Sequence, residues 1–128
     1  MTSQDKAEAN VAKALNAIRD LCHGASLQAG WWRESDTFDP HIVPTKLMLT
    51  VSELAEAMEG DRKNAMDDHL PHRKMLEVEL ADAIIRICDL AGFRQLDIGG
   101  ALVEKLAYNK VRMDHKIETR HRDGGKSY

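Results

Sequence analysis

Two short segments of matching sequence carry the side chains best suited to chemistry. Residues 53–57 read ELAEA and residues 79–83 read ELADA, so each segment holds two acidic residues three positions apart. In an α-helix such residues share one face, where like charges repel each other. A hard divalent cation relieves that repulsion, because Mg²⁺ and Mn²⁺ prefer oxygen ligands. The repeat therefore predicts a metal site made of Glu53, Glu56, Glu79 and Asp82.

The alternative is that both acidic faces are simply solvated. Arg86 follows Asp82 by one helical turn and could form an ordinary surface salt bridge with it. Neither segment has a histidine three residues after its glutamate, which argues against a di-iron carboxylate site. The repetition of the same pattern in two helices favours the metal site over the solvated faces.

A second set of residues could bind phosphate. Lys105, Asn109 and Arg112 are spaced by four and then three residues, so they share a helical face. Amino and guanidinium groups are suited to the oxygens of a triphosphate, although such a face is also common as plain solvated surface. The net charge of −3 divides into −6 for residues 1–103 and +3 for residues 104–128. This asymmetry suggests cations bound by the body and a phosphate-bearing ligand held by the C-terminal end.

The periodicity of apolar residues predicts four helices, at about 5–22, 44–60, 72–91 and 97–117. Pro44 suits a first helical turn, Gly60 and Gly92 suit helix ends, and Asp97 suits an N-cap. Residues 23–42 lack a clear period and are expected to form a long loop. The acidic faces lie outside the aliphatic stripes of their helices. No sustained β-strand alternation is present, so we expect an all-α, four-helix bundle.

Length and composition indicate one globular domain over residues 1–128, with a core at about 44–118 and a basic tail at 119–128. Hydrophobic residues make up 43% and charged residues 30%, and no apolar run approaches membrane-spanning length. The N-terminus lacks the apolar stretch of a secretory signal. Cys22 and Cys88 have no metal-type or paired spacing, which favours free thiols in the cytoplasm.

The motifs together resemble the MazG-like family of all-α nucleoside triphosphate pyrophosphatases, in particular its small stand-alone and phage-type members. Glu53-x-x-Glu56 precedes Glu79-x-x-Asp82 with 22 residues between, in the order of the family signature. The Lys105-x₃-Asn109-x₂-Arg112 segment and the ending with Gly125, Lys126 and Tyr128 resemble the family's C-terminal part. The resemblance covers residues 46–128.

The resemblance implies an activity and a role for each site residue. Glu53, Glu56, Glu79 and Asp82 would bind two or more Mg²⁺ ions, for which Mn²⁺ substitutes, and Glu53 or Glu56 would activate the attacking water. The phosphates would be bound by Lys105, Asn109, Arg112 and Lys126. The reaction would convert a (deoxy)nucleoside triphosphate to the monophosphate and pyrophosphate. A homodimer or homotetramer is implied, with neither a nucleic acid polymer nor a membrane as partner.

Trp31 and Trp32 are the only tryptophans, and their indoles could stack a nucleobase, with a purine such as guanine slightly preferred. They could instead cap the open end of the bundle as part of its core. Two other functions stay open. One is the phosphoribosyl-ATP pyrophosphatase reaction of histidine synthesis, which uses a similar bundle. The other is a non-catalytic helical module that binds a protein with its acidic face.

Overall fold

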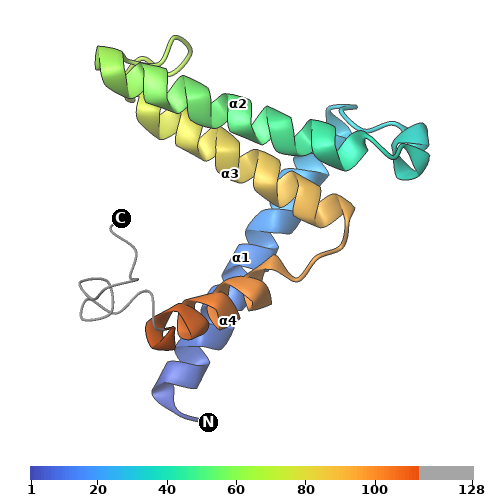
Figure 1. The fold of residues 1–128 in the computed structure, drawn as a ribbon, viewed down its shortest axis with the longest axis vertical. Coiled ribbons are helices and arrows are strands. Elements are labelled where there is room, and N and C mark those ends of the chain that lie inside the picture. Colours follow the sequence, from blue (N-terminus) through green and yellow to red (C-terminus); the bar gives the residue numbers. More distant parts are fainter. Residues whose placement is uncertain (113–128) are drawn as a thin grey trace, which may run out of the picture. The chain divides into compact units, whose positions relative to one another are not determined.

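The computed structural model describes residues 1–112, which form four α-helices and one short 3-10 helix (Figure 1). In chain order these are α1 (Ser3–Gln28), η1 (Glu34–Phe38), α2 (Ile42–Lys63), α3 (Met75–Phe93) and α4 (Ile98–Val111). Residues 1–112 contain no β-strand, so the predicted all-α class with four helices is confirmed. None of these helices is long and apolar enough to cross a membrane.

The chain divides into two compact units. One consists of Ala17–Leu96, and the other combines Met1–Asn16 with Asp97–Tyr128. The first unit contains α2, α3 and the second half of α1. The other contains the first half of α1 together with α4. The predicted end of the fourth helix near residue 117 is wrong, because α4 ends at Val111 and its C-cap Arg112 has extended backbone. The predicted tail at 119–128 lies outside the described residues.

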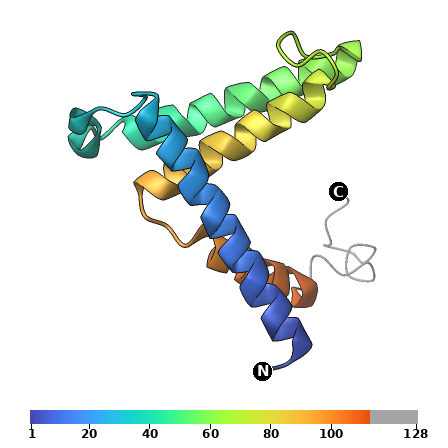
Figure 2. The ribbon, with the colours of Figure 1, turned by 180° about the vertical axis from the view of Figure 1, so that it is seen from behind.

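The helices α2 and α3 form an antiparallel hairpin and lie side by side in both views (Figures 1 and 2). Asn64 ends α2 in the left-handed conformation, with a φ of 48°. The loop that follows is closed by an antiparallel bridge between Met66 and Lys74 and by a 2.9 Å hydrogen bond from Met75 N to Ala65 O. These bonds fix how the start of α3 is set against the end of α2.

Small and acidic side chains, rather than large aliphatic ones, are the buried residues of this hairpin. They are Thr50, Glu53, Ala57 and Gly60 on α2, and Glu79, Ala83, Cys88 and Ala91 on α3. Most members of the apolar stripes that the sequence marks on both helices are between 44 and 61% exposed, namely Leu47, Val51, Leu54, Met58, Leu80, Ile84 and Ile87. In the stripe of α3, Leu76 is half-buried and Ala83 is buried. The acidic face of each helix is therefore the one that turns inward.

The predicted helix ends at Gly60 and Gly92 are wrong, because both glycines lie inside their helices. Each allows a close approach instead. A Cβ atom on Gly60 would lie 2.7 Å from Met75 Cγ, and one on Gly92 would lie 2.5 Å from His23 Cβ. The helices continue to Lys63 and Phe93, where Asn64 and Gln95 adopt the positive φ that glycine was expected to supply.

The first helix is longer than predicted at its C-terminal end, because α1 reaches Gln28 instead of ending near residue 22. Its second half contacts α3 and the residues that follow it. His23 Nδ1 lies 2.8 Å from Asp89 Oδ1 on α3, and Arg19 Nη1 donates to Leu96 O, after the end of α3, at 2.8 Å. These tertiary contacts hold a segment whose own sequence has no clear helical period. The predicted long loop is correspondingly reduced to residues 29–41, with η1 inside it.

In the other unit, the predicted N-cap at Asp97 is confirmed. Its side chain accepts a hydrogen bond from Gly100 N at 2.9 Å, which satisfies one of the free amides at the start of α4. Asn16 on α1 forms two hydrogen bonds with the N-terminal end of α4. Its Nδ2 donates to Asp97 Oδ1 and its Oδ1 accepts from Gly99 N, both at 2.8 Å. This side-chain network joins α4 to the first half of α1.

Candidate metal centre

The hairpin brings together three of the four predicted metal ligands. Glu53 on α2 and Glu79 on α3 are 9% and 8% exposed, and Glu56 lies at the exposed side of the same group. One carboxylate oxygen from each of the three falls within 4.8 Å of the others. The acidic faces predicted from the repeat therefore oppose each other across the contact between the two helices.

Asp82 lies beside this group but not within it. Burial raises the pKa of the half-buried Asp82 carboxyl, and the negative charge of Glu53 raises it further. The second effect shows that Asp82 shares the electrostatic field of the cluster. We use the name carboxylate cluster for Glu53, Glu56, Glu79 and Asp82.

Glu79 is the most perturbed member of the carboxylate cluster. Burial, followed by hydrogen bonding to Glu53 and Glu56 and by the charges of Glu56 and Asp82, raises the pKa of Glu79 to about 8. Its Oε2 atom is buried and accepts no hydrogen bond from any N–H or O–H donor of residues 1–112, since its polar neighbours are other carboxyl groups. A buried carboxyl oxygen without a partner is costly, so this atom marks a position where a ligand would be favoured.

Glu53 is shifted in the opposite direction. Burial opposes its ionisation, but the hydrogen bond from Arg86, with further bonds within the cluster, holds the pKa of Glu53 below its ordinary value. Arg86 Nε donates to Glu53 Oε1 at 2.8 Å. The spacing in the sequence allows a salt bridge between Arg86 and Asp82 on the same helix. In the structure Arg86 instead forms its hydrogen bond with Glu53 on the neighbouring helix.

The donor set fits a hard divalent cation. All of its ligand atoms are carboxylate oxygens, the type that Mg²⁺ and Mn²⁺ prefer. With Mg–O bonds of about 2.1 Å in an octahedron, adjacent ligand oxygens lie about 3 Å apart and opposite ones about 4.2 Å apart. The three oxygens lie within 4.8 Å of one another, so they would have to move closer together to hold one ion between α2 and α3.

Sequence reasoning missed Asp67, a buried carboxylate in the loop between α2 and α3. Asp67 is 9% exposed, and its Oδ2 accepts hydrogen bonds from His69 N at 2.9 Å and Leu70 N at 2.8 Å. Its charge is among those that raise the pKa of Asp82, after burial and Glu53. An aspartate that bonds amides two and three residues later is a common turn former, and that turn was the available sequence signal.

The two predicted base-binding tryptophans have different surroundings. The ring of Trp32 stacks on Phe93 at 4.1 Å, and Lys46 Nζ lies 4.2 Å from the Trp32 ring centroid. Trp32 is half-buried, and its ring is already engaged by both side chains. Trp31 is 71% exposed, so its indole is the one accessible to a nucleobase.

Asp89 holds Trp32 in place and was also missed. Its carboxylate accepts from Trp32 Nε1 at 2.9 Å and from Ser26 Oγ at 2.8 Å, and it contacts His23 Nδ1 at 2.8 Å. The sequence alone gives no sign of these bonds, which join residues 57 to 66 positions apart. They fix the path of the chain between α1 and α2.

Of the predicted phosphate-binding residues, Lys105 and Asn109 lie on α4 and Arg112 is the extended C-cap residue that follows it, so these three belong to the other unit. Lys105 Nζ lies 4.7 Å from the ring centroid of Tyr108, and Asn109 and Arg112 are half-buried. Asn109 Oδ1 is buried without a hydrogen-bond partner among the described residues. Lys126 lies outside the described residues.

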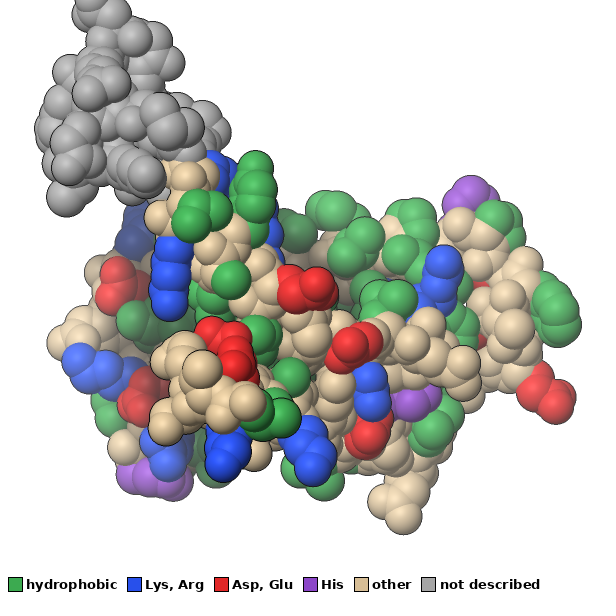
Figure 3. Space-filling model, turned by 90° about the horizontal axis from the view of Figure 1, so that it is seen from below, with side chains coloured by type: hydrophobic (Ala, Val, Ile, Leu, Met, Phe, Trp, Pro, Cys, Tyr) green, Lys and Arg blue, Asp and Glu red, His purple; other side chains and the backbone are tan. Residues whose placement is uncertain are grey.

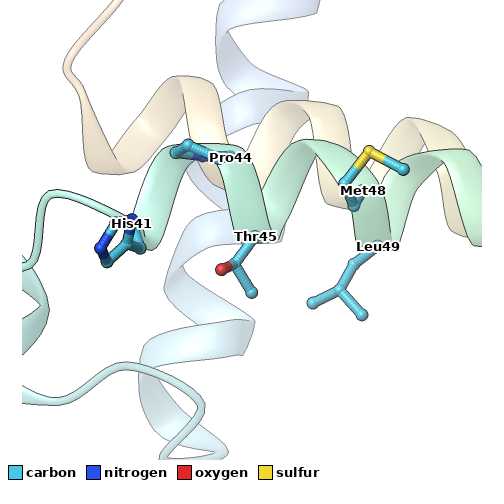
Figure 4. Close-up of a pocket in the computed structure, with 5 residues that line it drawn as sticks. All are labelled: His41, Pro44, Thr45, Met48 and Leu49. Atoms are coloured by element: carbon cyan, nitrogen blue, oxygen red, sulfur yellow. The ribbon is translucent and has the colours of Figure 1, made fainter.

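A shallow apolar groove opens on α2 next to the carboxylate cluster. Its volume is about 450 Å³, and Leu49 at one end lies one helical turn before Glu53. Figure 4 shows that the side chains lining it come from the start of this single helix, namely His41, Pro44, Thr45, Met48 and Leu49.

The chain matches no protein-family model, no curated protein and no solved structure. The likeness to MazG-like enzymes thus rests on the spacing of the acidic and basic motifs. The arguments for function come from the geometry of the carboxylate cluster.

Proposed function

We propose that this chain is a Mg²⁺-dependent enzyme that hydrolyses a (deoxy)nucleoside triphosphate to the monophosphate and pyrophosphate. The observation that carries the proposal is Glu79, a buried carboxyl whose unpartnered oxygen lies in a cluster with Glu53 and Glu56. A buried carboxyl oxygen without a hydrogen-bond partner lowers the stability of the fold if its role is only structural. A divalent cation bound to that oxygen would compensate for the loss. Further support is that the spacing of the repeated acidic motif, of Lys105 and Asn109 on α4 and of Arg112 after it resembles the pattern of MazG-like enzymes.

In the proposed site, Glu53, Glu56, Glu79 and Asp82 hold Mg²⁺ or Mn²⁺, with two or more ions per site. When bound, these ions neutralise the phosphate charge and lower the pKa of a coordinated water. Glu56 is exposed and Glu53 lies beside it, so either carboxylate can orient the water and accept its proton. The water oxygen bonds to the α-phosphorus, and the bond from that phosphorus to the bridging oxygen breaks.

The leaving pyrophosphate keeps the electron pair of the broken bond. We assign its binding to Lys105, Asn109 and Arg112, with Lys126 as a further contact, because cationic and amide donors suit its oxygens. We assign stacking of the base to Trp31, whose indole is exposed. Trp32 would take part only after Phe93 or Lys46 moves away from its ring. A purine is slightly preferred.

We also propose that the enzyme is a homo-oligomer, a dimer or a tetramer, and that it works in the cytoplasm. Figure 3 shows hydrophobic side chains distributed over the visible surface between the charged ones. Within residues 1–112 the buried hydrophobic side chains are Ala57, Ala83, Cys88 and Ala91, whereas most of the larger aliphatic side chains of α2 and α3 are exposed. Contact with a second copy would cover them. Two free cysteines suit a reducing compartment.

The proposal is tested with a panel of nucleoside triphosphates in Mg²⁺ and heavy-oxygen water. We expect monophosphate and pyrophosphate as products, with the heavy oxygen on the monophosphate, because attack occurs at the α-phosphorus. Heavy oxygen in released orthophosphate would refute the reaction, and so would the absence of turnover with every nucleotide.

Two variants connect the activity to the carboxylate cluster. Glu53→Gln and Asp82→Asn should each lower kcat/KM by about 100-fold or more, because each removes a charged ligand. Glu77→Gln is the matched control, since Glu77 is an exposed carboxylate of α3 that pairs with Arg73 instead. Turnover near the wild-type rate in either cluster variant would remove that residue from the site.

A further inference from the structure

Arg86 is the cation that the fold places against the carboxylate cluster. Its Nε donates to Glu53 Oε1 at 2.8 Å, and this bond crosses from α3 to α2. The side chain of Glu53 is 12% exposed and that of Arg86 is 37% exposed. The ion pair therefore has a buried carboxylate on one side and a guanidinium that reaches solvent on the other.

The position of Arg86 on α3 sets it at the end of the acidic row. It follows Asp82 by four residues and Glu79 by seven, so the three side chains share one face of the helix. The cluster thus has four carboxyl groups and one cation at its edge. In the absence of a metal ion, this cation is the charge that balances Glu53.

The guanidinium of Arg86 has further nitrogen donors that can bind a ligand. Only Nε bonds to Glu53, and neither terminal nitrogen of Arg86 makes a hydrogen bond with residues 1–112. An arginine presents these nitrogens as a planar fork that binds two oxygens of a phosphate group at once. Being partly exposed, the fork can meet a ligand that approaches the cluster from solvent.

A metal ion on Glu53 would disturb this pair. An ion bonded at about 2.1 Å to the same oxygen would lie no more than about 5 Å from Arg86 Nε, since the hydrogen bond measures 2.8 Å. Two cations at that distance repel each other strongly in a partly buried site. A triphosphate brings oxygens that can accept the displaced guanidinium.

We propose that Arg86 is an exchangeable counter-ion, which balances Glu53 in the metal-free chain and transfers to the phosphate chain of the substrate when divalent cations bind. This inference rests on the proposed function and adds a residue outside the repeated acidic motif. Arg86 thereby couples metal loading to phosphate binding. Arg86 competes with the metal ion for Glu53 before the ion binds, and it binds the phosphate chain of the substrate afterwards.

The first test measures Mg²⁺ affinity by calorimetry and thermal stability with and without Mg²⁺. Arg86→Gln should bind Mg²⁺ about fivefold more tightly than the wild type, because a competitor of modest strength is gone. Its Tm should be lower in chelator and should recover at saturating Mg²⁺. Arg73→Gln, the control, removes an exposed arginine that pairs with Glu77 and should change neither quantity.

Unchanged or weaker Mg²⁺ binding by Arg86→Gln would overturn the exchange, since Arg86 would then be a fixed support of Glu53. A variant that remains unfolded at saturating Mg²⁺ would overturn it too, because the metal should replace the lost cation. A variant that folds only with Mg²⁺ would support it.

The second test measures binding of a non-hydrolysable triphosphate with a methylene group between the α- and β-phosphorus, at saturating Mg²⁺. Arg86→Gln should weaken binding about tenfold or more, and Arg86→Lys should weaken it less, because lysine keeps the charge but loses the fork. Binding by Arg86→Gln equal to that of Arg73→Gln would overturn the transfer to phosphate.

The two proposals fail in different ways. A wild-type chain that binds neither Mg²⁺ nor the analogue refutes the proposed function, and the role of Arg86 with it. A wild-type chain that binds both, while Arg86→Gln behaves like Arg73→Gln, refutes only the role of Arg86.

Discussion

At the scale of single residues, Glu79 is a group whose burial lowers the stability of the fold. Its carboxyl group is buried among other acids, with one oxygen left without a hydrogen bond in the described part of the chain. Burial and the neighbouring carboxylates raise its pKa to about 8, so the metal-free chain keeps this group protonated at neutral pH. A metal ion must displace that proton before it can use the oxygen.

The raised pKa of Glu79 predicts how metal-free stability depends on pH. Between about pH 4.5 and about pH 8 the folded chain holds a proton that the unfolded chain has lost, so the free energy of unfolding should fall as pH rises. The raised pKa of Asp82 acts in the same direction. The lowered pKa of Glu53 acts in the opposite direction, but only below its ordinary value of 4.5. Urea unfolding in chelator across this range measures the slope.

Glu79→Gln is the variant that identifies the source of this slope. It should lose most of the decline between pH 4.5 and pH 8, because glutamine has no proton to release. Wild-type Mg²⁺ affinity should rise with pH up to about 8, as the competing proton leaves. A metal-free wild type whose stability is flat or rises over this range would contradict the assignment.

At the scale of helices, the sequence predicted the four elements and the shared acidic faces, but not which face turns inward. Periodicity identifies a face without identifying its partner, and the aliphatic stripe is ordinarily the one that packs inward. Here Glu53 and Glu79 are buried, while Leu54 and Leu80 of the same motifs are 46% and 44% exposed. The face that turns inward is determined by the packing of α2 against α3 through small residues. Only the three-dimensional structure shows that packing.

The ends of the helices were predicted well where the determinant is local. Asp97 caps α4 through a bond to an amide three residues later, which is a local signal. Gly60 and Gly92 carry a local signal as well, but their role is a close approach to Met75 and His23, which are distant in sequence. The pairing of Arg86 with Glu53 and the bonds of Asp89 are long-range in the same way.

The close approach at Gly92 predicts opposite effects for two glycine-to-alanine changes. Gly92→Ala should lower the free energy of unfolding by about 1–3 kcal/mol, because its Cβ would fall 2.5 Å from His23 Cβ and force the helices apart. Gly24→Ala should raise it by about 0.5–1 kcal/mol, because no heavy atom lies within 4 Å and alanine is the better helix former.

Chemical denaturation of the two variants, followed by circular dichroism, measures both changes. Gly24 lies inside α1 and so reports helix propensity without a steric penalty. Equal effects of the same sign in the two variants would mean that the contact between His23 and Gly92 does not constrain this packing.

At the scale of the whole molecule, the distribution of apolar surface is the main feature to explain. Most of the larger aliphatic side chains of the α2–α3 hairpin are exposed, whereas its buried residues are mainly small or acidic ones. Burial of large aliphatic side chains contributes about 1.5–3 kcal/mol each, so their exposure leaves a large stabilising term unused. Contact between copies of the chain would supply it, and closed two-fold symmetry would limit the assembly to a dimer or tetramer.

This reasoning predicts that the wild-type chain sediments at micromolar concentration with twice or four times the monomer mass of 14.4 kDa. Ile84→Lys should shift it to the monomer, because Ile84 belongs to the exposed aliphatic stripe of α3 and a lysine there would be buried in the contact. Asp61→Lys, at an exposed position in the last turn of α2, is the control and should leave the mass unchanged. If the chain were a monomer, Ile84→Lys would have little effect, since Ile84 is 52% exposed.

A fully active wild-type species of monomer mass would contradict the assembly. Loss of activity on dilution, in step with loss of the larger mass, would indicate that the active form needs more than one copy.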